Sequence, residues 1–126
     1  MTIGTPTYIA PEQAYALPEA GVLINVSNDA WFGDSIAPHQ HLQIARMRSL
    51  ETGRYTLRAA NTGISGFIGP KGKVHESGPQ FTAVTMTREV QPMRGATPYV
   101  TVGNWPILII GWVVLGIFWV RSRAAL

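Results

Sequence analysis

The chain has 126 residues, 46% of them hydrophobic and 13% charged, with a formal net charge of +3 and no cysteine. This length accommodates one small domain, and the missing cysteine excludes disulfides, thiolate metal ligands and a cysteine nucleophile within these residues. Residues 1–104 carry eight Lys and Arg against seven Asp and Glu, so they lack the basic surface of a nucleic-acid-binding protein, and we expect no nucleic-acid partner.

The first part of the chain has no hydrophobic period. Met1–Ala16 is rich in Pro, Ala and Thr, and we leave it as an unassigned, atypical leader. The run Val22–Val26 is short, apolar and β-branched, which predicts a strand buried on both faces. The polar residues of Ser27–Ser35 are typical of a loop at the end of such a strand.

A helix is expected after this loop. Pro38 suits the first turn of a helix, and Gly53 suits its C-terminal end. Apolar and small residues recur between them at helical spacing. The predicted buried stripe consists of Leu42, Ile44, Ala45, Met47, Ser49 and Leu50, with Arg46, Arg48 and Glu51 pointing largely outward.

Several short strands are expected next. Tyr55–Ala60 alternates in polarity, and Ile64–Ile68 is predicted to be its neighbour. Gly69–Lys73 has turn residues, and Val74–Glu76 continues as a short strand. Phe81–Val90 alternates again and is predicted to be a further strand.

The C-terminal region predicts a membrane span. Trp105–Val120 has 13 hydrophobic residues out of 16 and no charge, and residues 99–121 reach across both interfaces of a bilayer. The alternative, a buried core helix, is disfavoured because the remaining residues cannot surround a helix that is apolar on all sides. Arg121 and Arg123 place the tail of residues 122–126 in the cytoplasm by the positive-inside rule.

The order of elements over residues 17–98 predicts an α+β domain. A strand, a loop and a helix are followed by several strands, which suits a layered sheet. A single helix cannot cover both faces of that sheet. We therefore expect a partial domain with uncovered apolar strand faces, followed by one transmembrane helix.

Two stretches of the sequence are more specific than these general patterns. Asn25–Ser35, followed by residues 38–41 and 45–51, and Arg58–Ser65 closely resemble the C-terminal third of the apolipoprotein N-acyltransferases, bacterial inner-membrane enzymes with a nitrilase-like domain. The resemblance extends from about residue 17 to the end of the chain. Its further motifs are Gly69–Gly72, Pro79–Phe81, Thr97–Tyr99 and Gly103–Pro106.

The resemblance implies a fold and an activity. The family has a periplasmic nitrilase-like αββα sandwich that precedes a last membrane helix, and its members transfer an acyl chain from a phospholipid donor to the N-terminal cysteine amine of an apolipoprotein acceptor. The transfer uses a Glu–Lys–Cys triad and a thioester on the cysteine. The chain would then be a C-terminal fragment, with its domain part periplasmic and its C-terminus cytoplasmic.

The family's nucleophile has no counterpart in these residues. Its cysteine ends the strand before Val22–Val26, and a thioester route requires sulfur. We therefore assign no catalytic residue and expect the chain to be inactive alone. The resemblance assigns Asn28, Asp29, Trp31 and Phe32 to the loop beside the active site, where they line the substrate pocket. The alternative is that Trp31 and Phe32 pack beneath the loop.

The sequence leaves other interpretations of site and function to be considered. His39 and His41 lack the three or four convergent ligands of a metal site, so we expect no metal, and we expect no cofactor. An alternative function is a non-enzymatic single-pass membrane protein whose small periplasmic domain binds a partner. A remnant of a soluble nitrilase-type amidase is disfavoured by the membrane helix.

Overall fold

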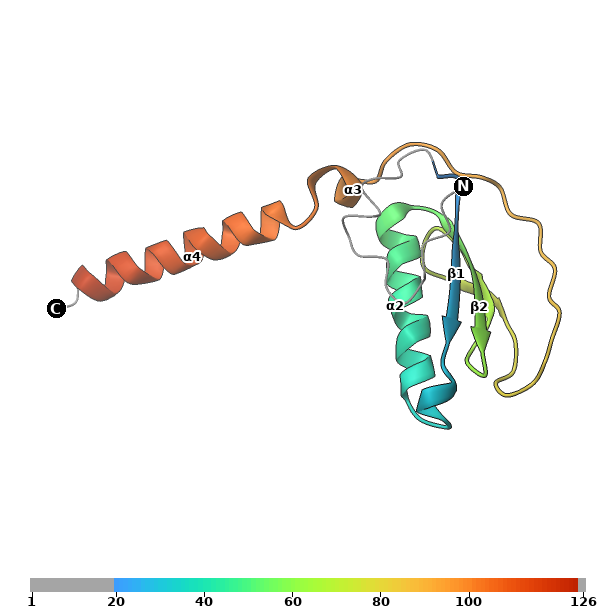
Figure 1. Ribbon diagram of the computed structural model, residues 1–126. Coiled ribbons are helices and arrows are strands. Elements are labelled where there is room, and N and C mark those ends of the chain that lie inside the picture. The colour runs from blue at the N-terminus through green and yellow to red at the C-terminus, as the bar shows by residue number, and fades with distance from the viewer. Residues whose placement is uncertain (1–19, 125–126) are drawn as a thin grey trace.

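A computed structural model describes residues 20–124, and the expected leader Met1–Ala16 lies outside them. The elements are β1 (Val22–Asn28), a 3-10 helix η1 (Ala30–Phe32), α2 (Ala37–Thr52), β2 (Tyr55–Asn61), β3 (Gly66–Ile68), β4 (Val74–Ser77), α3 (Pro98–Val102) and α4 (Trp105–Ala124). Figure 1 shows a sheet with α2 along one face and α4 extending away from the domain. The predicted α+β class is confirmed.

The sheet has four strands in the order β1-β2-β3-β4. β1 and β2 are parallel, and α2 connects them, while β3 and β4 add in antiparallel fashion. The carboxyl ends of β1 and β2 therefore meet at the same edge of the sheet, where Asn28 pairs with Asn61. Open sheets of this type bind their ligands beyond the carboxyl ends of parallel strands.

Helix α2 packs on the sheet through small side chains. Ala45 and Ser49 are buried, and the Ser49 hydroxyl donates to Thr56 Oγ1 over 2.6 Å. These small residues allow a close approach of helix and sheet. The helix ends at Gly53, whose left-handed φ of 64° a residue without a side chain adopts at little cost.

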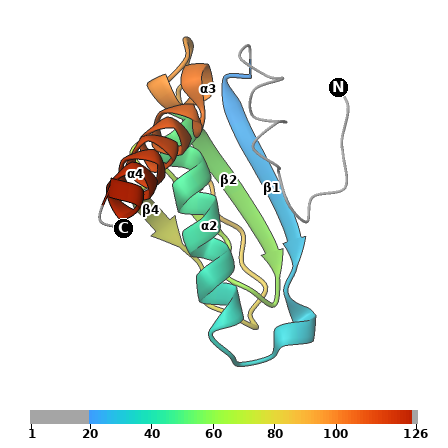
Figure 2. The same ribbon diagram turned by 90° about the vertical axis from the view of Figure 1, so that its left-hand side faces the viewer.

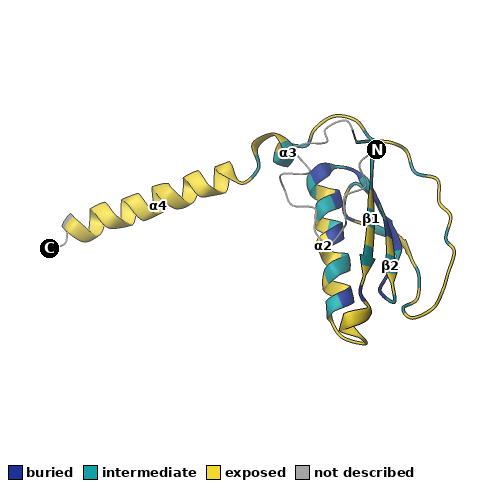
Figure 3. Cartoon of the chain, in the orientation of Figure 1, coloured by how far each residue is buried: buried dark blue, intermediate teal, exposed yellow. Residues whose placement is uncertain are grey.

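The outward side of α2 differs from the expectation. Ile44, Met47 and Leu50 were expected in the buried stripe, but each is close to half exposed. Ala45 and Ser49 occupy the helix face that meets the sheet, so the larger side chains lie on the opposite face or at its borders. The alternating blue and yellow of α2 in Figure 3 follows this division.

The other face of the sheet is only partly covered. Ile24, Leu57 and Phe67 lie side by side across three strands on this face. Phe67 is buried, whereas Ile24 is 60% exposed, and Val26 on the same strand is also exposed. The expectation that β1 is buried on both faces is therefore wrong. The expected uncovered apolar face is found on β1 but not over residues 55–68, where Ile64, Phe67 and Ile68 are buried.

The segment after β4 is not a strand. Phe81–Val90 was predicted to be one, but these residues form no regular element, and Phe81 and Val84 are exposed. A strand exists only where its backbone groups pair with a neighbour, and within the described residues none pairs with this segment. The segment instead passes along the outside of the domain before reaching α3.

The predicted membrane helix is divided. Gly103 has a φ of 56° and separates the short α3 from α4, so Tyr99 belongs to a different helix from Trp105. The Trp105–Arg123 stretch of α4 is long and apolar enough to cross a membrane, and none of it is buried against the domain. Within the part of the chain that the structure describes, no other element covers this helix.

Candidate functional site

The carboxyl end of β1 leads directly into a tight turn. The Asn28 side chain accepts a hydrogen bond from the backbone N–H of Ala30, and the N–H of Phe32 donates to the carbonyl of Asp29. The N–H of Asp29 donates to the carbonyl of Asn61, which holds this turn against the end of β2. The side chains of Asp29 and Trp31 are thereby placed beside the carboxyl ends of the two parallel strands.

A buried ion pair lies beneath this turn. Asp29 Oδ2 and Arg58 Nη2 are 2.9 Å apart, and the two residues are only 1% and 5% exposed. Arg58 also donates to the carbonyl of Ile64 over 3.1 Å and to the side chain of Asn25. Burial lowers the pKa of Arg58, while the charge of Asp29 and its hydrogen bond oppose that shift.

The second oxygen of Asp29 meets two further side chains. Asp29 Oδ1 accepts from the Ser27 hydroxyl over 3.2 Å and lies 2.9 Å from His41 Nδ1. An ionised carboxylate only accepts hydrogen bonds, so the proton of this contact belongs to His41 Nδ1. The His41 ring stands edge-on to Phe32, with centroids 5.1 Å apart. Asp29 therefore connects β1, β2, α2 and the turn.

Gly63 makes room for this carboxylate. A Cβ atom at position 63 would lie 2.2 Å from Asp29 Oδ2 and 2.9 Å from Asp29 Cβ. No side chain fits at such a distance while Asp29 stays in place. The ion pair therefore requires glycine at position 63. The pair also connects the two stretches that carry the family resemblance, Asn25–Ser35 and Arg58–Ser65.

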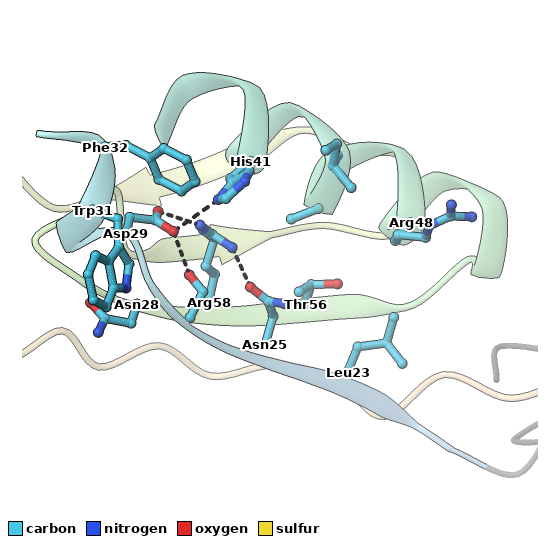
Figure 4. Close-up of a pocket in the computed structure, with 13 residues that line it drawn as sticks. Leu23, Asn25, Asn28, Asp29, Trp31, Phe32, His41, Arg48, Thr56 and Arg58 are labelled. Atoms are coloured by element: carbon cyan, nitrogen blue, oxygen red, sulfur yellow. Dashed lines mark hydrogen bonds and ion pairs between the residues drawn. The ribbon is translucent and has the colours of Figure 1, made fainter. Parts of the chain in front are cut away.

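A cavity of about 420 Å³ opens between β1 and α2 above the ion pair. Figure 4 shows Asp29, Arg58 and Asn25 as a connected polar floor, with Phe32 and His41 at one end. The apolar part of its wall comes from Leu23, Trp31, Phe32, Ile44 and Ala45. An apolar wall with a few fixed polar groups is the usual composition of a small-molecule site.

The four loop residues singled out in the sequence all line this cavity, namely Asn28, Asp29, Trp31 and Phe32. Their surroundings differ, because Asp29 is buried whereas Trp31 is 88% exposed. Such exposure does not fit a role of Trp31 in packing beneath the loop.

Sequence reasoning missed Arg58, Asn25 and His41 as parts of the same site. The signal for Arg58 was a charged residue in the middle of an otherwise uncharged strand. A strand interior places such a residue under α2, where burial requires a partner of opposite charge. For His41, the pairing with Asp29 depends on how α2 crosses the sheet, which the spacing of the residues does not reveal.

The comparison with known protein families decides the class of this fold. A family model described as carbon-nitrogen hydrolase matches residues 9–99. The chain belongs to the carbon-nitrogen hydrolase family. The match contains β1, α2 and the three following strands, so the ion pair and the cavity both lie within the family's domain.

Several curated relatives of this chain are apolipoprotein N-acyltransferases. The chain is 52% identical over 112 residues to the apolipoprotein N-acyltransferase of Methylococcus capsulatus, covering 89% of this chain and 22% of that protein. The apolipoprotein N-acyltransferase of Nitrosomonas europaea is 57% identical over 88 residues, covering 70% of this chain and 18% of the relative. The chain therefore spans about a fifth of the length of these relatives.

A third relative shows the same similarity. The apolipoprotein N-acyltransferase of Haemophilus influenzae is 52% identical over 93 residues, which are 74% of this chain and 18% of the relative. The predicted resemblance to this family is thus confirmed. The match to the carbon-nitrogen hydrolase model ends at residue 99, just before α4 begins at Trp105.

Proposed function

We propose that this chain is the C-terminal part of an apolipoprotein N-acyltransferase, which transfers an acyl chain from phospholipid to the N-terminal cysteine amine of a lipoprotein. The proposal rests on the presence of a cavity and an apolar helix in the same chain. An apolar-walled cavity lies at the carboxyl end of β1, and a fully exposed apolar helix follows the same domain. Both suit a reaction in which one substrate is a membrane lipid.

The proposed role of these residues is to shape the pocket. Trp31, Phe32 and Ile44 offer apolar surface for an acyl chain, because burying hydrocarbon releases free energy in proportion to its area. Asn28 and Asp29 are among the polar groups of the same pocket, and Asp29 is held in place by Arg58. A fixed floor of this kind keeps the walls at constant distance while a flexible substrate enters.

No catalytic residue is proposed within the chain. Acyl transfer through a thioester requires a sulfur nucleophile beside a base, and the 126 residues contain no cysteine. The nucleophile, its base and its lysine would belong to other parts of the enzyme. We therefore propose that the purified chain alone does not catalyse the transfer.

The proposed domain organisation follows the same division. Residues 17–98 form the C-terminal part of the nitrilase-like domain, 99–121 the transmembrane region and 122–126 a cytoplasmic tail, with the domain in the periplasm of the bacterial inner membrane. Arg121 and Arg123 at the end of α4 support this orientation. It is tested by labelling a Ser122→Cys variant, since the chain has no other cysteine. A membrane-impermeant maleimide is expected to reach it only after cell lysis, and labelling in intact spheroplasts would contradict the orientation.

The function is tested with a chimera. Residues 17–126 of this chain replace the matching region of the Methylococcus capsulatus relative, and transfer from phospholipid to a diacylated lipopeptide is followed by mass spectrometry. We expect the chimera to form the triacylated product and the 126-residue chain to form none. A folded, membrane-inserted chimera without activity would favour the non-enzymatic alternative, and product formation by the chain alone would contradict the proposed division of roles.

A further inference from the structure

The exposed residues of α2 include no Lys, Arg, Asp or Glu. Glu51 lies one helical turn after Met47 on the same side, but its side chain is only 20% exposed and pairs with Arg48. At 100° per residue, Met47 stands opposite the buried pair Ala45 and Ser49. Met47 and Leu50 are 45% and 49% exposed, and their neighbours on this face, Gln40 and Gln43, have no charge. A helix that faces water usually has charged residues on this side. The uncharged outer stripe of Gln40, Gln43, Met47 and Leu50 therefore indicates contact with something other than water.

The C-terminal end of α2 is attached to the segment that leads into α4. The Thr97 hydroxyl donates to the carbonyl of Glu51 and accepts from the N–H of Val100 over 3.2 Å, so it caps α3 and joins it to α2 at once. A Cβ atom on Gly53 would lie 2.9 Å from the Thr97 methyl group, which shows how close the two segments are. Gly103 and Asn104 are then the only residues between α3 and α4.

The direction of α4 places the outer stripe toward the membrane. In Figure 1, α4 leaves the domain on the side where α2 lies, and the sheet is on the opposite side. Figure 2 is viewed from that side, and there α4 projects in front of the domain while α2 lies in front of the sheet. A bilayer crossed by α4 would therefore face the outer stripe of α2.

Two lysines flank the same surface. The turn between β3 and β4 packs on α2, because Arg46 Nε donates to the carbonyl of Gly72 over 2.9 Å. A Cβ on Gly72 would lie 3.6 Å from Leu50 Cβ, so this turn borders the outer stripe. Lys71 and Lys73, on either side of Gly72, are exposed. Cations beside an uncharged stripe complement a surface of anionic phospholipid.

We propose that α2 lies on the surface of the phospholipid bilayer that α4 crosses, with Met47 and Leu50 at the boundary between headgroups and acyl chains. This contact is continuous with the membrane segment through Thr97 and α3. Ile44 both borders the outer stripe and lines the cavity, so the cavity would lie next to the lipid. The inference rests on the insertion of α4 and not on the proposed acyl transfer.

The chain's lack of cysteine allows single-site labelling. Nitroxide labels are attached to Met47→Cys and to Ile24→Cys in the full chain, reconstituted into vesicles of phosphatidylethanolamine and phosphatidylglycerol. Ile24 is a matched control, because it is apolar and exposed but lies on the sheet face turned away from α2. Leu115→Cys, in the middle of α4, reports insertion. Oxygen and nickel-complex accessibility give the depth of each label.

We expect the label at position 47 about 5–10 Å below the phosphate level, as for interfacial helices, and the label at position 24 in water. Both labels in water, both in lipid, or strong dipolar coupling between labels at position 47 of two chains would each overturn the inference. These outcomes apply when the label at position 115 lies deep in the bilayer. A label at position 115 near the bilayer surface would show that α4 is not inserted, and this result would also overturn the inference. Because activity is not measured, none of these results depends on the proposed acyl transfer.

The two lysines are tested in the same vesicles. Replacing both in Lys71→Gln/Lys73→Gln is expected to move the label at position 47 toward water, since each basic residue near an anionic surface adds to its attraction. Arg88→Gln/Arg94→Gln removes the same charge from the exposed segment before α3 and is the matched control. An unchanged depth in the lysine variant, or an equal change in the control, would overturn the role of the turn.

Discussion

Asp29 and Arg58 are 29 positions apart in the sequence, and their side chains form a buried ion pair at 2.9 Å. The pair joins the carboxyl end of β1 to the middle of β2 and forms the floor of the cavity. Each partner has further hydrogen bonds, Asp29 with Ser27 and His41, and Arg58 with Asn25 and Ile64. The cavity therefore depends on a polar network rather than on an apolar core.

Breaking this pair from one side is expected to be costly. Arg58→Ala leaves the Asp29 carboxylate buried without its counter-charge, and the expected loss in the free energy of unfolding is about 3–5 kcal/mol. The measurement is urea unfolding of the full chain in detergent micelles, followed by far-ultraviolet circular dichroism. Arg88→Ala, at an exposed position, should change stability by less than about 0.5 kcal/mol. The double variant Asp29→Asn/Arg58→Met should be more stable than Arg58→Ala, because no unpaired charge remains; a double variant that is less stable would contradict this account.

Gly63→Ala should perturb the same network sterically. The new methyl group would overlap Asp29, and such overpacking costs about 1–3 kcal/mol. Gly111→Ala is the matched control, since a Cβ there meets nothing within 4 Å. We expect a reduced unfolding midpoint for Gly63→Ala alone, together with a shifted His41 ring resonance in NMR spectra. Equal midpoints for the two variants would show that Asp29 can move without cost.

The Thr97 hydroxyl should control how firmly α3 is attached to α2. Thr97→Val removes both the cap of α3 and the bond to Glu51, and loss of a helix cap alone costs about 0.5–2 kcal/mol. Hydrogen exchange at Val100 and Thr101 is therefore expected to accelerate, with little change in β2. Thr97→Ser keeps the hydroxyl and should retain slow exchange. Similar exchange in both variants would assign the attachment to other contacts, such as that of buried Arg54 with the carbonyl of Gly95.

Trp31 should affect function without affecting stability. Its side chain is almost fully exposed, so Trp31→Ala is expected to change the free energy of unfolding by less than about 0.5 kcal/mol. In the chimera, the same change should lower acyl transfer if the exposed ring contacts the acyl chain. The readout is transfer as a function of phospholipid concentration, with Phe81→Ala as an exposed aromatic control outside the cavity lining. A large loss of stability in Trp31→Ala would instead indicate a packing role.

Insertion of α4 should depend on where a charge is placed in it. Leu115→Arg puts a cation near the helix centre, at an apparent cost of about 2.5–3.5 kcal/mol. Ser122→Arg puts the same charge beside Arg121 and Arg123, where it can reach the headgroups. We expect carbonate washing of membranes to release more of the Leu115→Arg chain than of the Ser122→Arg chain. Equal retention would mean that α4 does not span the bilayer.

The sequence by itself determined the local elements. The β-branched run of β1, the Pro38 and Gly53 limits of α2, the turn before β4 and the charge-free helix α4 all follow from short-range patterns. Such patterns report periodicity and backbone preference, which neighbouring residues decide. The resemblance to the acyltransferases also came from contiguous strings, and it included the four loop residues that line the cavity.

Only the tertiary structure decided which residues meet. The alternation of Phe81–Val90 predicted a strand, but a strand must pair with a neighbour, and this segment pairs with neither of the described edge strands, β1 and β4. The helical spacing of Met47 and Leu50 predicted burial, but the sheet meets the small residues of α2 instead. The pairing of Asp29 with Arg58 depends on the parallel register of β1 and β2, and its contact with His41 depends on how α2 crosses these strands. Sequence separation contains neither geometry.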